Sequence, residues 1–125
     1  IGRLSALCGC SIAAAIGAAS AMVFLRGGNF EQIAYAVNMM VGDVTGIICD
    51  GAKPGCALKI ATAVSAAQRA AVLALSVQPY GIVSSDVEAT IQNLGTLGRD
   101  GMGNANDVVL RMMLDGQHDE NVLRL

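Results

Sequence analysis

The hydrophobic positions along the chain follow a helical period. Three long apolar stretches cover Leu4–Leu25, Phe30–Ile48 and Ala57–Val77, and shorter amphipathic stretches follow at Ser85–Leu97 and Asn104–Leu114. We find no alternating run of strand length and no internal repeat. The sequence therefore predicts an all-α fold of about five helices, with glycine-rich crossings.

Glycines and capping residues set the expected helix ends. Gly27-Gly28 ends the first helix, and Asn29–Gln32 has the pattern of a capping box for the second. A similar box, Ser85–Glu88, opens the fourth helix. Gly42 and Gly46 fall inside the second helix, where they either permit a close helix crossing or mark an early break.

The first apolar stretch, Leu4–Leu25, carries no charge and is flanked by Arg3 and Arg26. It is long enough to span a bilayer, but its many small and polar residues give it a weak apolar drive. We therefore expect a buried central helix around which the others pack, and no membrane span. There is no signal-peptide pattern, so the expected location is cytoplasmic.

Length and charge narrow the class of protein. With 125 residues, we expect a single helical domain over 1–125, in which the polar residues 116–125 form a frayed tail. The net charge is −2 and aromatic residues are few, so no nucleic-acid partner is expected. The chain starts without Met and enters an apolar run at once, which is typical of a piece of a larger protein. Apolar surface left uncovered in such a piece predicts a homo-oligomer.

The chain has four cysteines, which lie in two short segments of the sequence. Cys8 and Cys10 are in the first segment, and Cys49 and Cys56 are in the second. Free cysteine often packs as a small buried apolar residue. A disulfide between Cys8 and Cys10 is poor, because side chains two apart on a helix diverge. The C-x-C and C-x6-C spacings match neither a zinc knuckle nor a ferredoxin motif. The spacing thus permits a metal site without naming the metal.

The segment Cys49–Cys56 has the local chemistry of a binding loop. Cys56 stands at the predicted start of the third helix, where the helix dipole and free N–H groups favour a thiolate. Gly51 lets backbone amides approach a sulfur or a substrate carboxylate, and Lys53 adds a positive charge. Asp50 either orients a neighbouring group or simply forms the turn.

Several segments together resemble a known enzyme family. They are Leu7–Ala14, Gly27-Gly28, Asn38-Met39, Gly42-Asp43, Thr90–Gly95, Gly101–Gly103 and, above all, Ile48–Lys59. With these segments the chain resembles the C-terminal part of the L-cysteine desulfidase family, which is related to the alpha chain of the iron–sulfur L-serine dehydratases. The resemblance covers nearly the whole chain apart from the tail, and the block around the cysteine loop is its specific part.

The resemblance implies a [4Fe-4S] cluster held by three cysteines, with one iron open as a Lewis acid. Carried over by position, Cys49 is the best-matched ligand, Cys8 is preferred to Cys10 upstream, and Cys56 is the third. Lys53 becomes a candidate base or substrate-carboxylate ligand, and Asp50 and Gly51 become candidate substrate-binding residues. We expect the cluster to be lost from an aerobically prepared piece.

The implied reaction of cysteine catabolism removes the thiol from L-cysteine and gives pyruvate, ammonia and sulfide. The Lys-Pro-Gly sequence after Cys49 favours this desulfidase over an L-serine dehydratase, which has Asp-Pro and a longer spacer. The desulfidase family also carries a Gly-Cys-Thr-Glu-Pro motif in an N-terminal region that is absent from this sequence. That missing region is therefore an expected partner. A structural or regulatory helical domain without a cluster is the alternative outside enzymes.

The remaining polar and sulfur-containing residues are less informative. We interpret Lys59, one turn into the third helix, as structural, and His118 as a residue of the tail without a catalytic role. Asn38 lies among apolar residues and is expected to form a hydrogen bond across helices. Met39-Met40 and Met112-Met113 are expected to fill the core.

Overall fold

The computed structural model describes residues 6–117, with side chains to residue 116. Its helices are α1 (Ala15–Leu25), α2 (Phe30–Val44), α3 (Cys56–Leu73), α4 (Val87–Thr96) and α5 (Ala105–Gln117), with two π-helical turns, η1 (Cys10–Ala14) and η2 (Leu97–Gly101). Residues 6–117 contain no strand, only one isolated bridge between Leu7 and Ile48. The predicted all-α class is confirmed.

The capping residues behave largely as the sequence predicts. The Asn29 side chain accepts a hydrogen bond from the Gln32 amide (2.9 Å), and the Gln32 side chain accepts one from the Asn29 amide (2.9 Å). Helix α2 ends at Val44, so Gly46 marks an early break. Helix α4 is capped by Asp86, whose carboxylate accepts the backbone N–H two residues further on (3.0 Å).

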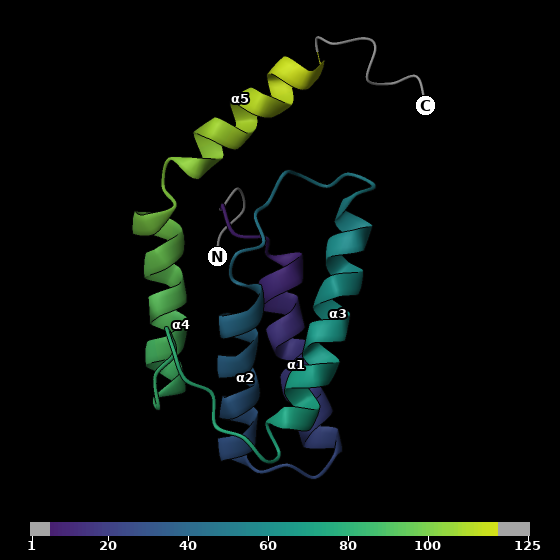
Figure 1. Cartoon of the computed structure of the whole chain (residues 1–125), viewed down its shortest axis with the longest axis vertical. Coiled ribbons are helices and arrows are strands. Elements are labelled where there is room, and N and C mark those ends of the chain that lie inside the picture. Colours follow the sequence, from purple (N-terminus) through teal and green to yellow (C-terminus); the bar gives the residue numbers. More distant parts are fainter. Residues whose placement is uncertain (1–5, 118–125) are drawn as a thin grey trace.

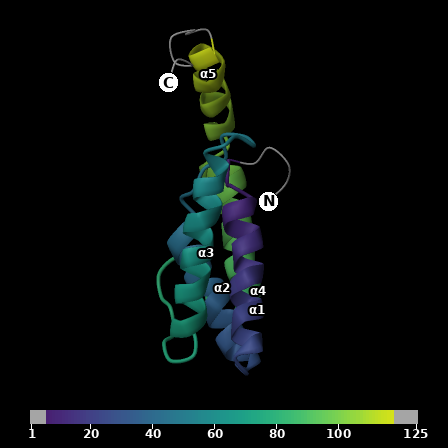
Figure 2. The same cartoon turned by 90° about the vertical axis from the view of Figure 1, so that its right-hand side faces the viewer.

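Three helices form the body of the fold. Helices α1, α2 and α3 pack against one another side by side, and α4 packs on α2 (Figures 1 and 2). Helix α5 packs against none of the other helices in the described chain and extends from one end of the bundle (Figure 1). The expected packing around the first apolar helix therefore holds for α2 and α3 but not for α4 and α5.

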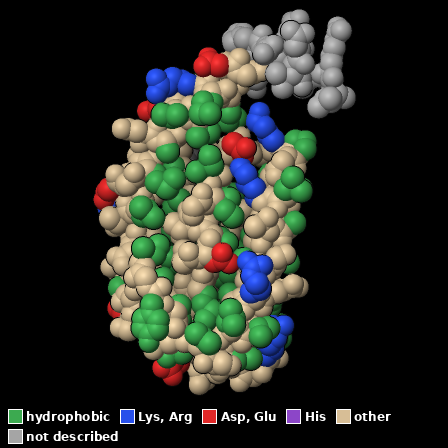
Figure 3. Space-filling model, viewed as in Figure 1, with side chains coloured by type: hydrophobic (Ala, Val, Ile, Leu, Met, Phe, Trp, Pro, Cys, Tyr) green, Lys and Arg blue, Asp and Glu red, His purple; other side chains and the backbone are tan. Residues whose placement is uncertain are grey.

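Helix α1 is buried along one stripe only. Ala15, Ala19 and Val23 are buried, whereas Phe24 and Leu25 are 69% and 81% exposed. The expectation of burial on every face is wrong for the described chain, because α1 has close neighbours on two sides only. Exposed apolar side chains also occur elsewhere, and Figure 3 shows hydrophobic side chains spread over a whole face of the molecule.

Alanine rather than glycine makes the helix contacts close. All five buried residues of α3 are alanines, and they share one core cluster with Ala15 and Ala19 of α1 and Ala36 of α2. Gly17 and Gly42 have no neighbouring atom within 4 Å of the place where a Cβ would stand. The expected glycine-rich crossings are thus alanine-rich crossings, in which a methyl group fills space that glycine would leave empty.

Helix α3 is also the one helix of residues 6–117 that is long and apolar enough, by length and composition, to cross a membrane. One such helix is weak evidence, since core helices pass the same test, and the alanine face of α3 packs on α1 and α2. The helical part of the first apolar stretch, Cys10–Leu25, is shorter than this length.

The last helix is longer than predicted. Helix α5 runs to Gln117, past the predicted end at Leu114. It therefore includes the first residues of the segment that we expected to fray. The rest of that segment, with His118, lies outside the described residues.

Replacing glycine with alanine is expected to change the stability of the fold in opposite directions at Gly28 and at Gly17. A Cβ on Gly28 would lie 2.4 Å from Cγ1 of Val23 and 3.0 Å from its carbonyl oxygen, and valine has little freedom to move away. We expect Gly28→Ala to lower the free energy of unfolding by about 1–3 kcal/mol. Gly17→Ala, inside α1 with open space around it, is the matched control and should raise it by up to about 1 kcal/mol. Urea unfolding measures both, and equal effects of the two substitutions would contradict the packing described here.

Candidate functional site

The isolated bridge brings the two cysteine regions together. The segment around Leu7 runs antiparallel to the segment around Ile48, with hydrogen bonds from the Cys8 amide to the Ile47 carbonyl (2.9 Å) and from the Cys49 amide to the Ala6 carbonyl (2.8 Å). Cys8 and Cys49 thus take diagonal positions on one face of the pair, where residues are typically about 7–8 Å apart. Two cysteines that are distant in sequence are neighbours in the fold.

The Cys8 sulfur is buried and hydrogen-bonded. Its thiol donates to the Ser11 hydroxyl oxygen (3.4 Å), and the backbone N–H groups of Ser11 and Cys10 also point at the sulfur. Burial raises the pKa of the Cys8 thiol, but these hydrogen bonds and the nearby Lys59 charge outweigh it and hold the pKa below its usual value. The surroundings of this sulfur therefore favour its ionised form more than water does.

The turn that presents Cys10 and Ser11 is π-helical rather than α-helical. In η1 the amide of Ala14 bonds the carbonyl of Gly9 (3.2 Å), five residues earlier. Single π-helical turns next to α-helices are frequent at functional sites, because the wider turn changes the direction of side chains. This turn was not predictable from the sequence, because the apolar pattern continues through it without a break into α1.

Cys56 faces the upstream pair from the start of α3. It is the first residue of that helix, as predicted, and its side chain is partly buried. Burial, followed by the charges of Cys10 and Cys8, nevertheless raises the pKa of the Cys56 thiol, and the opposing effect of Lys59 is smaller. The raised pKa runs against the stabilisation of a thiolate that we expected at this helix start. The charge interactions put the Cys56 sulfur within electrostatic range of Cys10 and Cys8.

An ion pair ties the cysteine loop to α3. The Lys59 ammonium donates to the Asp50 carboxylate and to the Ile48 carbonyl oxygen (3.1 Å). The hydrogen bond from Lys59 lowers the pKa of Asp50, and the bond to Asp50 raises the pKa of Lys59, so both groups stay charged at neutral pH. Asp50, a predicted substrate-binding residue, thus has a partner within the protein.

The other predicted loop residues lie close by. Gly51 has a φ of 88°, in the left-handed region that favours glycine. Lys53 is exposed, and its charge contributes to the lowered pKa of Asp50. A turn follows in which the Cys56 amide bonds the Lys53 carbonyl (2.8 Å) and leads directly into α3. The loop is therefore shaped by backbone geometry at both ends.

A cavity of about 390 Å³ opens beside Cys49. Cys49, Asp50 and Gly51 line one side of it, and α5 lines the other with Asn106, Asp107, Val109, Leu110 and Met113. The sequence analysis did not include α5 in the site. Nothing in the periodicity of α5 predicts this placement, which depends on how the chain bends between η2 and α5.

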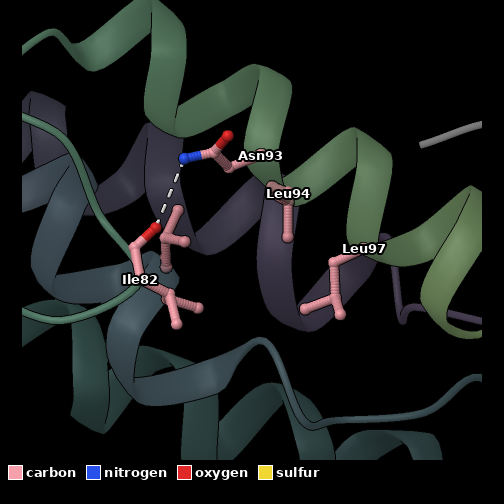
Figure 4. A pocket seen from close by; sticks show the side chains of 5 residues that line it. Ile82, Asn93, Leu94 and Leu97 are labelled. Atoms are coloured by element: carbon pink, nitrogen blue, oxygen red, sulfur yellow. Dashed lines mark hydrogen bonds between the residues drawn. The ribbon is translucent and has the colours of Figure 1, made fainter.

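A second cavity, of about 240 Å³, lies between α2, α4 and the segment before α4 (Figure 4). Its lining residues are Val41, Ile82, Asn93, Leu94 and Leu97, and the Asn93 amide lies 3.5 Å from the Ile82 carbonyl oxygen. The lining is mostly apolar and includes no predicted site residue. This cavity offers little to hold a polar substrate.

The buried amide of Asn38 serves the packing of the same segment. Its Nδ2 donates to the Ser84 carbonyl (2.8 Å), so the expected hydrogen bond joins α2 to the segment before α4 rather than to another helix. Its buried Oδ1 has no protein partner within the described chain. We assign Asn38 to the packing of that segment.

The cysteine side chains can be tested for their fit to a metal ion or an iron–sulfur cluster. Among residues 6–117, no three Cys, His, Asp or Glu side chains are grouped closely enough to hold one metal ion. In an iron–sulfur cluster each cysteine binds a different iron, so the thiolates stand further apart than the ligands of one ion. Cysteine sulfurs that the bridge brings near one another from two chain segments are the donor type that binds iron–sulfur clusters.

These features define a helical protein with a cysteine-lined site at one end of its bundle. The family model described as "Serine dehydratase alpha chain" matches residues 1–111. The chain therefore belongs to the serine dehydratase alpha chain family, and the family relationship inferred from the sequence is confirmed.

Curated relatives agree with this placement. The chain is 45% identical over 117 residues to a UPF0597 protein of Porphyromonas gingivalis, covering 90% of this chain and 27% of the relative. It is 50% identical over 118 residues to a UPF0597 protein of Oleidesulfovibrio alaskensis, covering 91% and 27%. A UPF0597 protein of Phocaeicola vulgatus is 46% identical over 125 residues, with 95% and 28% covered. The chain thus spans about a quarter of the length of these relatives. No solved structure matches it.

Proposed function

We propose that this chain is the cluster-binding part of an iron–sulfur lyase that acts on L-cysteine. The observation that carries the proposal is the diagonal placement of Cys8 and Cys49 at the Leu7–Ile48 bridge, with Cys56 at the start of α3 within electrostatic range of Cys8. Such an arrangement in a serine dehydratase alpha chain supports a site that eliminates a leaving group from a small amino acid.

Cys8, Cys49 and Cys56 would hold the [4Fe-4S] cluster, with Cys10 as the alternative to Cys8. When bound, the cluster would supply a Lewis acid at its open iron. The hydrogen bonds to the buried Cys8 sulfur favour this residue over the exposed Cys10, because they hold a thiolate at a fixed point.

The cavity between the cysteine loop and α5 is the proposed substrate pocket. Gly51 lines it without a side chain, and Val109, Leu110 and Met113 of α5 give it an apolar wall opposite Cys49. Lys53 is the candidate base for the α-proton, or the group that binds the substrate carboxylate. Loss of the α-proton and of the thiol would convert cysteine into aminoacrylate and sulfide, and hydrolysis of aminoacrylate gives pyruvate and ammonia. In this role Asp50 contributes chiefly by fixing the loop, through Lys59.

L-serine dehydratase is the second candidate, because the matching family model carries that description. The Lys-Pro-Gly sequence in the loop favours cysteine instead. We further propose that residues 1–125 form the C-terminal catalytic part of a longer cytoplasmic protein. The remaining regions of that protein, or a second copy of this part, would cover the exposed apolar side chains.

Anaerobic reconstitution of the full-length protein with iron and sulfide tests the function. We expect visible charge-transfer absorption, and sulfide release from cysteine that is faster than pyruvate release from serine. The same protein without iron is the control. Faster turnover of serine would select the dehydratase. Failure to bind iron, together with no product from either amino acid, would leave a helical domain without catalytic function.

A further inference from the structure

Lys59 holds the chain on both sides of Cys49. It lies in the first turn of α3, three residues after Cys56, and its ammonium bonds the Ile48 carbonyl (3.1 Å) and the Asp50 carboxylate. These are the residues immediately before and after Cys49. A single side chain from α3 therefore fixes the backbone from which the Cys49 sulfur projects, opposite the bridge that fixes it from the Leu7 side.

The charge of Lys59 also lies within electrostatic range of the sulfurs. The charges of Cys8 and Cys49 act to raise the pKa of Lys59. The Lys59 charge in turn acts to lower the pKa of Cys8 and of Cys56. Its side chain is 23% exposed, so water screens this charge less than that of a surface lysine. Thiolates that approach one another repel, and a cation among them offsets part of the repulsion.

We propose that Lys59 is the positioning residue of the cysteine site: it fixes the Cys49 segment against α3 and offsets the negative charge of the sulfurs that face it. The first role, fixing the Cys49 segment, does not require a bound cluster. The second role rests on the proposed function, because it concerns the charge of a bound iron–sulfur group.

Alkylation of Cys49 in the cluster-free full-length protein tests the fixing role. It is measured at a pH where the thiol is ionised, so that access rather than ionisation sets the rate. We expect Lys59→Met to raise the rate about tenfold, because the loop opens more often without its charged hydrogen bonds. Lys59→Arg should restore most of the slow rate, and Asp50→Asn, which weakens one of the two contacts, should give an intermediate rate.

Arg69→Met is the matched control. Arg69 lies on the same helix and pairs with Asp43 at 3.2 Å, but both members of this ion pair are largely exposed and neither belongs to the cysteine loop. We expect no change in Cys49 alkylation in this variant. Circular dichroism of each variant shows whether its helices remain. If Lys59→Met does not fold, the rates of Lys59→Arg and Asp50→Asn decide, and a wild-type rate in Asp50→Asn would overturn the fixing role.

Iron content and reduction potential after reconstitution test the charge role. We expect Lys59→Met to retain less iron and to have a lower potential, whereas Lys59→Arg keeps both near wild type. Unchanged alkylation in Lys59→Met would overturn the fixing role. Unchanged iron and potential in that variant would overturn the charge role. Faster alkylation in Lys59→Met, together with a wild-type protein that binds no iron, would support the fixing role and reject the proposed function.

Discussion

Replacing Cys49 with serine in the full-length protein is expected to remove the bound iron and the lyase activity together. Cys49 lies one residue from the bridge and lines the cavity beside the loop, so it belongs to both the proposed cluster site and the substrate pocket. A Lewis acid contributes several kcal/mol of transition-state stabilisation, so activity should fall by about 10³-fold or more. Iron analysis, visible absorption and sulfide release from cysteine measure the effect.

The upstream cysteines provide the comparison for this substitution. Cys8→Ser should reproduce the loss, because the Cys8 sulfur is buried among N–H donors, whereas Cys10→Ser should cause a much smaller one. Loss of iron in Cys10→Ser alone would make Cys10 the ligand. Full iron content and activity in Cys49→Ser would show that the ligand assignment is wrong.

Replacing Ala67 with leucine should strongly destabilise the helical body. Ala67 is completely buried in α3 and belongs to the cluster of alanines through which α3 packs on α1 and α2. The added carbon atoms find no free volume, so we expect the free energy of unfolding to fall by about 1–3 kcal/mol. Each kcal/mol corresponds to a decrease in melting temperature of roughly 4–8 °C for a small domain.

Ala61→Leu is the matched control for this effect. Ala61 lies on the same helix but is exposed, so the same chemical change occurs with room for the new side chain. Thermal unfolding of the two variants therefore separates packing from helix propensity. Similar melting temperatures in Ala67→Leu and Ala61→Leu would mean that the alanine contacts are loose enough to accept a larger residue.

The sequence was sufficient for the helices because their signals are local. Apolar periodicity and the Asn29–Gln32 capping box act within a few residues, and both are present in the structure. The environment of α1 was not predictable in the same way. An uncharged stretch indicates that burial of its side chains is favourable, but it does not reveal how many helices surround the helix. Phe24 accordingly remains exposed in the described chain.

The arrangement of the site depended on contacts that have no local signature. The Leu7–Ile48 bridge is one backbone pair, too short to produce an alternating pattern. Lys59 has the position of an ordinary lysine in a first helical turn, and its contacts with Asp50 depend on how the loop folds back. Spacing and loop chemistry drew attention to the cysteines, but a role as cluster ligands could be proposed only because their surrounding residues resemble those of a family.

The bridge also has a consequence for the order in which the protein matures. It closes a loop of roughly forty residues that contains α1 and α2, and closing such a loop in an unfolded chain costs about 3 kcal/mol of entropy. The helical hairpin lowers this cost by bringing the two ends of the loop together in advance. Cys8 and Cys49 are therefore expected to become neighbours more readily once the hairpin has formed. An inorganic group that needs both sulfurs is then expected to enter a chain in which α1 and α2 are already paired.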